Sequence, residues 1–67
     1  MKCWKCETKE VKVIVIADDG YYDDKGVCGD DACVYSAERA QFSWCSVMEL
    51  GEYLAKYPNG LEYIEHA

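Results

Sequence analysis

Two pairs of cysteines carry the clearest chemistry in this 67-residue sequence. Two residues separate Cys3 from Cys6, and four residues separate Cys28 from Cys33. A closely spaced pair can bind a metal ion through both sulfurs, and two pairs together can supply a closed tetrahedron of thiolates. The sequence therefore predicts one structural zinc ion, bound by these four side chains.

A bound metal ion would stabilise a chain that is too short to form a large hydrophobic core. Folding buries only about 60% of the surface that an unfolded chain of this size exposes, so the core alone is marginal. Structural zinc in small finger peptides contributes an apparent ~10–16 kcal/mol of coupled binding and folding near neutral pH. We therefore expect residues 1–67 to form a single zinc-binding domain.

Disulfide bonds are the alternative use of the cysteines, and they belong to oxidising compartments. Met1-Lys2-Cys3 does not begin an apolar leader, and the longest apolar run, 13–17, is shorter than the about 17 residues that a membrane span needs. A redox pair at Cys3 and Cys6 would follow a strand, for which the sequence leaves no room. These features favour zinc in a cytoplasmic protein, with a thiol redox or metal-handling protein as an alternative.

The charge of the chain limits the partners that we expect. Thirteen acidic residues face seven basic ones, which gives a formal net charge of −6. Four thiolates around a divalent ion would make the charge more negative still. Nucleic-acid binding depends on neutralising phosphates with Lys and Arg, so a nucleic-acid-binding zinc finger is a second alternative that the charge disfavours.

A predicted strand and hairpin lie between the two cysteine pairs. Residues 10–17 are rich in β-branched side chains that alternate, and the second half of this strand is expected to be covered on both faces. One face would carry Val11, Val13, Val15 and Ala17, and the other would carry Lys12, Ile14 and Ile16. Residues 18–20 predict a turn and 21–22 a returning strand, with 23–26 as a hairpin tip or a loop.

A helix is predicted over residues 31–41, and it places Cys33 in its first turn. Asp30 or Asp31 can accept hydrogen bonds from the free amides at its start. The positive end of a helix also stabilises a thiolate. The core of the domain would then extend over residues 3–42.

A second helix and a tail are predicted over residues 46–67. Ser46 and Glu49 match the capping box that opens a helix. Helical spacing then gives an apolar stripe of Val47, Leu50, Leu54 and Tyr57, flanked by Met48 and Tyr53. The turn at 58–60 would end this helix, and the alternating residues 61–65 predict an edge strand or a loose tail.

The segment Val27-Cys28-Gly29-Asp30-Asp31-Ala32-Cys33, together with Cys3-Trp4-Lys5-Cys6, resembles treble-clef and zinc-ribbon-like four-cysteine zinc fingers. The resemblance covers residues 3–42 and implies a small α+β fold made of a knuckle, a β-hairpin and a helix around one structural zinc ion. Members of this class usually have two or three residues within the second pair, whereas this chain has four. The class hosts ribosomal, ubiquitin-pathway, nuclease and adaptor roles, so the resemblance implies no single function.

An acidic, tyrosine-bearing face is the candidate surface for a partner. Six aspartates fall between residues 18 and 31, and aromatic residues are enriched at interface cores. A face of this kind would dock on a basic protein surface, although turns, helix capping and solubility also account for the charges. The candidate partner-binding residues are Asp18, Asp19, Tyr21, Tyr22, Asp23, Asp24 and Trp4. Trp4 can alternatively cover the metal site.

The size, acidity and lone zinc module resemble the small host-takeover proteins of bacteriophages. This resemblance implies an inhibitor of a host protein that handles nucleic acid, such as RNA polymerase, a nuclease or a CRISPR effector, in the host cytoplasm. A zinc ion closed by four thiolates has no open position for catalysis, and His66 is the only histidine that could activate a nucleophile. We expect no enzymatic activity, a solvated His66, and Cys45 as a small buried side chain, with ligand substitution or thiol reactivity as its alternatives.

Overall fold

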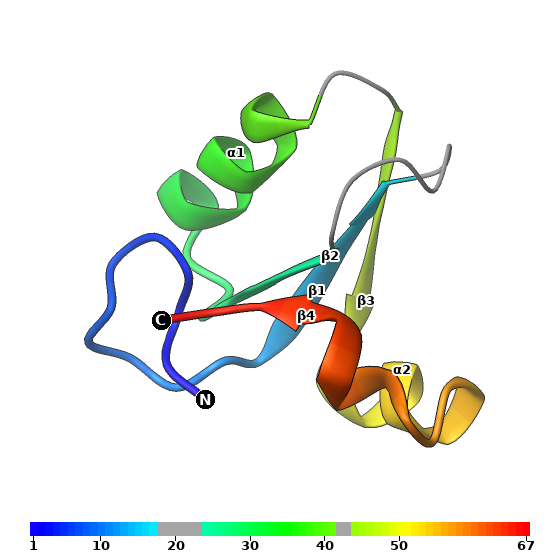
Figure 1. Cartoon of the computed structure of the whole chain (residues 1–67). Coiled ribbons are helices and arrows are strands. Elements are labelled where there is room, and N and C mark those ends of the chain that lie inside the picture. Colours follow the sequence, from blue (N-terminus) through cyan, green and yellow to red (C-terminus); the bar gives the residue numbers. More distant parts are fainter. Residues whose placement is uncertain (18–23, 42–43) are drawn as a thin grey trace.

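The computed structural model describes residues 1–17, 24–41 and 44–67, which form a small α+β domain with two helices and a four-strand sheet (Figure 1). The strand order in the sheet is β3-β1-β2-β4. The elements, in chain order, are β1 (Val13–Ala17), β2 (Asp24–Val27), α1 (Asp31–Ala40), β3 (Cys45–Glu49), α2 (Leu50–Lys56), the 3-10 helix η1 (Gly60–Tyr63) and β4 (Ile64–Glu65).

Strand β1 is central, and it is covered on both faces as its sequence predicts. It pairs antiparallel with β2 and with β3, so that Val15 lies opposite both Lys25 and Val47. The neighbouring side chains of Ile14 and Val15 point to opposite faces and are both fully buried. The prediction for this strand is confirmed, with a start at Val13.

Each face of the sheet has its own apolar cluster. On one face, Val15 and Val27 pack with Ala37 of α1 and with three of the paired cysteines. On the other face, Ile14 packs with Val11, Tyr53 and Ile64. Val11 therefore lies with Ile14, and the prediction that placed it with Val15 is wrong, because the regular alternation begins only at Val13.

Residues 24–26 belong to strand β2, so their prediction as a hairpin tip or loop is wrong. Gly26 lies opposite Ile14, and a Cβ there would lie 3.0 Å from side-chain atoms of Val11 and Ile64. The sheet therefore needs the close backbone approach that glycine allows at this point. The predictions for the turn at 18–20 and for the strand at 21–22 lie outside the described residues.

Residues 45–49 form strand β3, and the prediction of a helix beginning after Ser46 is wrong. Ser46 pairs with Ile16 across the ladder, and Val47 pairs with Val15. Helix α2 begins only at Leu50, whose amide donates to the Lys12 carbonyl over 2.9 Å. Pairing with the edge of the buried strand β1 outweighs the local capping box. This pairing joins segments that are distant in the chain, so the local sequence does not encode it.

The buried face of α2 also differs from the predicted stripe. Tyr53, expected at a flank, is the residue that α2 buries, with 3% of its surface exposed. Val47 and Tyr57, expected within the stripe, are 49% and 43% exposed. The later start of α2 accounts for this, since Val47 projects from a strand.

Helix α1 agrees closely with its prediction, and it begins at Asp31 with Cys33 in its first turn. The main-chain carbonyl of Asp30 accepts hydrogen bonds from the amides of Cys33 and Val34. The Asp30 carboxylate makes no capping hydrogen bond and instead pairs with Lys9 at 2.7 Å. The capping role predicted for the Asp30 side chain is therefore wrong, because the metal loop offers it a cation.

The end of the chain returns to the sheet. Pro58 and Asn59 follow the end of α2, as predicted, and η1 leads into β4. Strand β4 pairs parallel with β2, so the edge-strand alternative holds for Ile64–Glu65. The Ala67 amide donates to the Lys2 carbonyl over 3.1 Å, which places both termini side by side (Figure 1). Among the described residues, no helix has the length and hydropathy needed to cross a membrane.

Candidate metal centre

The four paired cysteines meet at one point between the first loop, the end of β2 and the start of α1. Their sulfur atoms all lie within 4.8 Å of one another, so they form a cluster that can hold a metal ion. A tetrahedral zinc site with Zn–S distances of about 2.3 Å places its sulfurs about 3.8 Å apart. The separation of the sulfurs is therefore compatible with a single shared ion. Cys3, Cys28 and Cys33 are buried, and Cys6 is half-buried.

Main-chain hydrogen bonds shape the loop that carries Cys3 and Cys6. The Cys3 amide donates to the Lys9 carbonyl over 2.8 Å, and the Glu7 amide donates to the Cys3 carbonyl over 3.0 Å. Glu7 adopts a left-handed conformation with φ of 64°, which turns the chain after Cys6. The Trp4 amide donates to the Gly26 carbonyl over 2.8 Å and so fixes this loop beside β2.

The second pair occupies the junction between β2 and α1. Cys28 directly follows β2, and Gly29 then takes a φ of 96°, a conformation that other residues rarely adopt. The main-chain carbonyl of Asp30 then accepts hydrogen bonds from the amides of Cys33 and Val34, and Cys33 lies in the first turn of α1. The four residues within this pair thus form a left-handed turn and a helix start, which together aim both sulfurs at the first loop.

The surroundings of the first loop lower the pKa of both its thiols, Cys3 and Cys6. The amides of Thr8 and Lys9, with the Thr8 hydroxyl, lower the pKa of Cys6 to about 6. The Thr8 hydroxyl lies 3.5 Å from the Cys6 sulfur. Burial raises the pKa of Cys3, but hydrogen bonds from the amides of Cys6, Lys5 and Cys28 lower it by more. Amides directed at sulfur are the usual environment of a thiolate ligand.

The pKa of both thiols in the second pair, Cys28 and Cys33, is raised above its ordinary value. Burial, followed by the neighbouring thiols, raises the pKa of Cys33 to about 12. The Asp30 amide lowers the pKa of Cys28, but burial and the thiols of Cys3 and Cys6 raise it overall. A divalent ion would have to displace these protons, so its binding would release acid and weaken as the pH falls.

Trp4 packs against the core that contains three of the cysteines and forms a hydrogen bond to Glu65 in β4. Its ring is half-buried against the cysteine side of the core. The indole Nε1 donates to Glu65 over 3.2 Å, and Lys25 Nζ lies 4.9 Å from the ring centroid. Lys25, which is itself buried, also donates to Glu65. The role of Trp4 as a partner-binding residue stays a prediction.

The remaining described candidates, Asp24, Cys45 and His66, are not members of the cysteine cluster. Asp24 is half-buried in β2, where it accepts a hydrogen bond of 2.9 Å from the Tyr53 hydroxyl. The other candidates of the acidic face lie outside the described residues, so that face stays a prediction: Asp18, Asp19, Tyr21, Tyr22 and Asp23. Cys45 is half-buried and packs against the apolar core on the α1 face. His66 is exposed, as expected.

A pocket lined by tyrosines is the feature that the sequence did not predict. Its volume is about 440 Å³, and Tyr53, Tyr57 and Tyr63 contribute to its wall. The spacing of Tyr53 and Tyr57 is a signal for a shared helix face. Tyr63 joins them only through the turn at 58–60, which no local pattern predicts.

Comparisons with protein-family models, curated protein sequences and solved structures found no match to this chain. The treble-clef assignment therefore stays a prediction. The structure bears out the small α+β domain and the clustering of four cysteines.

Proposed function

We propose that this chain is a non-enzymatic, zinc-stabilised module that binds another protein. The observation that carries the proposal is the convergence of Cys3 and Cys6, from the start of the 67-residue chain, with Cys28 and Cys33, from its middle. A set of four thiolates suits zinc among the common protein metals, because soft sulfur ligands in a tetrahedron select it. Reduced thiols also suit a reducing compartment such as the cytoplasm.

The donor set supports a structural role for the ion. A catalytic zinc ion binds three protein ligands and keeps a fourth position for water or substrate. Four cysteines fill the tetrahedron, so the ion would have neither the water nor the open position that hydrolysis needs. The ion would instead join the first loop to the start of α1 and stabilise the fold.

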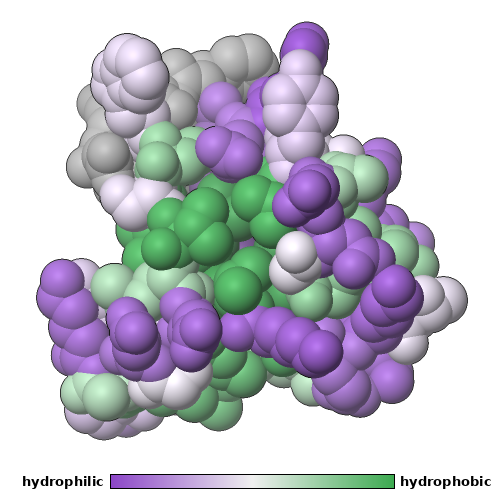
Figure 2. Space-filling model, turned by 180° about the vertical axis from the view of Figure 1, so that it is seen from behind, coloured by the Kyte–Doolittle hydropathy of each residue, from purple (hydrophilic) through white to green (hydrophobic). Residues whose placement is uncertain are grey.

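The surface supports a role in binding protein. Large apolar or aromatic side chains are strongly exposed at Trp44, Tyr63 and Tyr35, by 87%, 65% and 59%. Figure 2 shows hydrophobic surface gathered at the centre of the face opposite to that of Figure 1, with hydrophilic side chains around it. Contiguous apolar surface of this kind commonly marks an interaction site. The net charge of −6 favours a partner with a basic surface, such as a host protein that holds nucleic acid.

Metal content tests the zinc part of the proposal. Purified protein is expected to contain one zinc ion per chain by plasma mass spectrometry. Cys28→Ser should lose it, whereas Cys45→Ser is the matched control and should keep it, since Cys45 is not one of the four clustered cysteines. Equal zinc content in both variants would contradict the role of Cys28 as a ligand, and metal-free protein with paired disulfides would support the redox alternative instead.

Affinity capture tests the interaction part. The tagged protein is incubated with lysate, and bound proteins are identified by mass spectrometry, with the double variant Asp23→Asn/Asp24→Asn in parallel. The proposal expects a partner with a basic surface whose capture falls in the variant. Unchanged capture would contradict docking through these acids. Tight, salt-sensitive binding to DNA or RNA would favour the nucleic-acid-binding alternative.

A further inference from the structure

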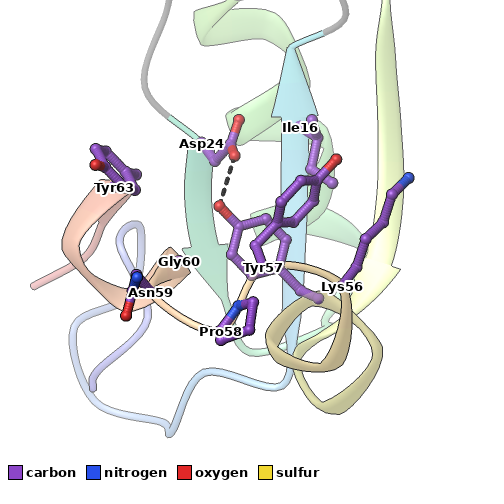
Figure 3. A pocket seen from close by; sticks show the side chains of 9 residues that line it. Ile16, Asp24, Lys56, Tyr57, Pro58, Asn59, Gly60 and Tyr63 are labelled. Atoms are coloured by element: carbon purple, nitrogen blue, oxygen red, sulfur yellow. Dashed lines mark hydrogen bonds between the residues drawn. The ribbon is translucent and has the colours of Figure 1, made fainter.

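The tyrosine pocket lies on the side of the molecule remote from the cysteine cluster. It has a volume of about 440 Å³ and opens between the end of α2, the following turn and the start of β2 (Figure 3). Among the described residues, its wall combines aromatic rings with a carboxylate and an amine: Asp24, Tyr53, Lys56, Tyr57 and Tyr63. Pockets with apolar walls and a few placed polar groups are the usual form of a binding site.

The Tyr53 ring is buried in the wall of the pocket, and the other two tyrosine rings are partly exposed. The Tyr53 and Tyr57 centroids lie 5.1 Å apart, with ring planes inclined by 53°. A Cβ at Gly60 would lie 2.4 Å from the Tyr53 ring, so a residue with a side chain at this position would clash with the ring. Tyr63, 65% exposed, stands at the rim. Aromatic faces carry negative potential and attract cations.

The carboxylate of Asp24 adds a negative charge to this aromatic wall. The Tyr53 hydroxyl donates to Asp24 Oδ2 over 2.9 Å, as the dashed line in Figure 3 marks. A carboxylate offers about four acceptor positions on its two oxygens, so one hydrogen bond does not saturate it. Tyr53 thus orients the carboxylate toward the pocket without consuming its capacity to bind a donor.

Lys56 shows that a ring of this pocket already accepts a cation. Its Nζ lies 5.4 Å from the centroid of the Tyr57 ring. In Figure 3 the Lys56 side chain runs beside Tyr57 and away from Asp24 and Tyr63. An incoming cation would therefore meet the carboxylate and the rings first, with Lys56 as a competitor at the edge.

We propose that this pocket accepts an arginine side chain of the partner protein. The inference rests on the proposed function as a protein-binding module and names the chemistry of the contact. Arginine fits best because its planar guanidinium is weakly hydrated, stacks on aromatic rings and donates two parallel hydrogen bonds to a carboxylate. The net charge of −6 would attract basic partners over a longer range.

Peptide titration followed by NMR tests the pocket directly. The probe is a five-residue glycine-serine peptide with a central arginine, and the control peptide carries citrulline, which keeps the shape and removes the charge. The arginine peptide is expected to shift the ring resonances of Tyr53, Tyr57 and Tyr63 in a saturable way, and to bind several-fold more tightly than the citrulline peptide. Equal responses to both peptides, or no saturable shift, would overturn the proposal.

Variants identify the contributing groups. Tyr63→Ala and Asp24→Asn should each weaken binding of the arginine peptide by about two- to five-fold, the range of an exposed cation–aromatic or ionic contact. Lys56→Gln should strengthen it, because a competing cation is removed. Tyr35→Ala is the matched control: Tyr35 is an exposed tyrosine on α1 with Arg39 over its ring, and it lies outside the pocket. A Lys56→Gln variant that binds more weakly would contradict the assigned roles.

The zinc content and the dispersion of the amide spectrum are recorded for each variant. A variant that keeps one zinc ion and a native spectrum but loses the peptide response identifies a pocket residue. If the peptides fail to bind while lysate capture still finds a basic partner, the pocket assignment is wrong and the proposed function survives. If capture finds no protein partner at all, the proposed function itself fails.

Discussion

The two faces of the sheet are stabilised in different ways. On the α1 face, three buried cysteines form part of the core, and apolar packing is shared among small side chains such as Val15, Val27 and Ala37. On the α2 face, the core is built from larger groups, including Ile14, Ile64 and the ring of Tyr53. With the proposed zinc ion bound, the first face would depend on the metal, whereas the second depends on packing and hydrogen bonds.

Loss of one cysteine ligand is expected to have the largest effect. Cys33→Ser removes a buried ligand and leaves three thiols packed together, so the chain should lose most of its helical circular dichroism at room temperature. The reason is that coupled metal binding supplies ~10 kcal/mol or more in zinc-finger peptides, which exceeds what a core of this size provides. Cys45→Ser serves as the control. Native circular dichroism in Cys33→Ser would show that packing alone suffices on the α1 face.

A substitution at Gly60 tests whether packing around Tyr53 stabilises the α2 face. Gly60→Ala forces a methyl group against the Tyr53 ring, where its Cβ would lie 2.4 Å from Cε1, so we expect a loss of about 1–3 kcal/mol in the free energy of unfolding. Gly51→Ala is the matched control within α2, because a Cβ there meets nothing within 4 Å and alanine favours a helix by up to about 1 kcal/mol. Chemical denaturation measures both. Zinc content should stay unchanged, and its loss would contradict the separation of the two faces.

The stability of the α2 face should fall at high pH through Tyr53. Burial and the bond to Asp24 raise the pKa of Tyr53 from 10.0 to about 12, so the folded state holds this proton more tightly than the unfolded state does. Its contribution is complete below pH 10 and is lost as the pH rises from there to about 12. The difference in unfolding free energy between wild type and Tyr53→Phe should shrink over that interval. A constant difference would contradict the raised pKa.

The smallest effect is expected at Glu65, in the edge strand β4. Lys25 and Trp4 both donate to Glu65, and the hydrogen bond from Lys25 lowers the pKa of its carboxyl group. Its contribution is therefore present above pH 4.5 and is lost as the pH falls through the lowered folded value. Glu65→Gln should cost about 1 kcal/mol or less, since Glu65 is partly exposed. Glu62→Gln is the control, and an equal effect of both on thermal unfolding would contradict this role.

Local sequence predicted the α1 face better than the α2 face. The spacing of the cysteines, the β-branched run of β1 and the start of α1 are encoded within a few residues each, and all three appear in the structure. Strand β3 depends instead on pairing with Ile16 and Val15, whose partners Ser46 and Val47 lie 30 and 32 residues away in the chain. The place of Gly26 beside Ile64 and the meeting of Tyr63 with Tyr53 are likewise contacts between distant segments. Such contacts have no local signature. The capping box at Ser46 therefore predicted a helix where the chain forms strand β3.

Zinc K-edge X-ray absorption on the purified protein tests the central claim most directly. Four sulfur neighbours at about 2.3 Å from one zinc ion are predicted, with the same spectrum for Cys45→Ser. Nitrogen or oxygen neighbours in place of sulfur, or folded protein that contains no zinc, would contradict it.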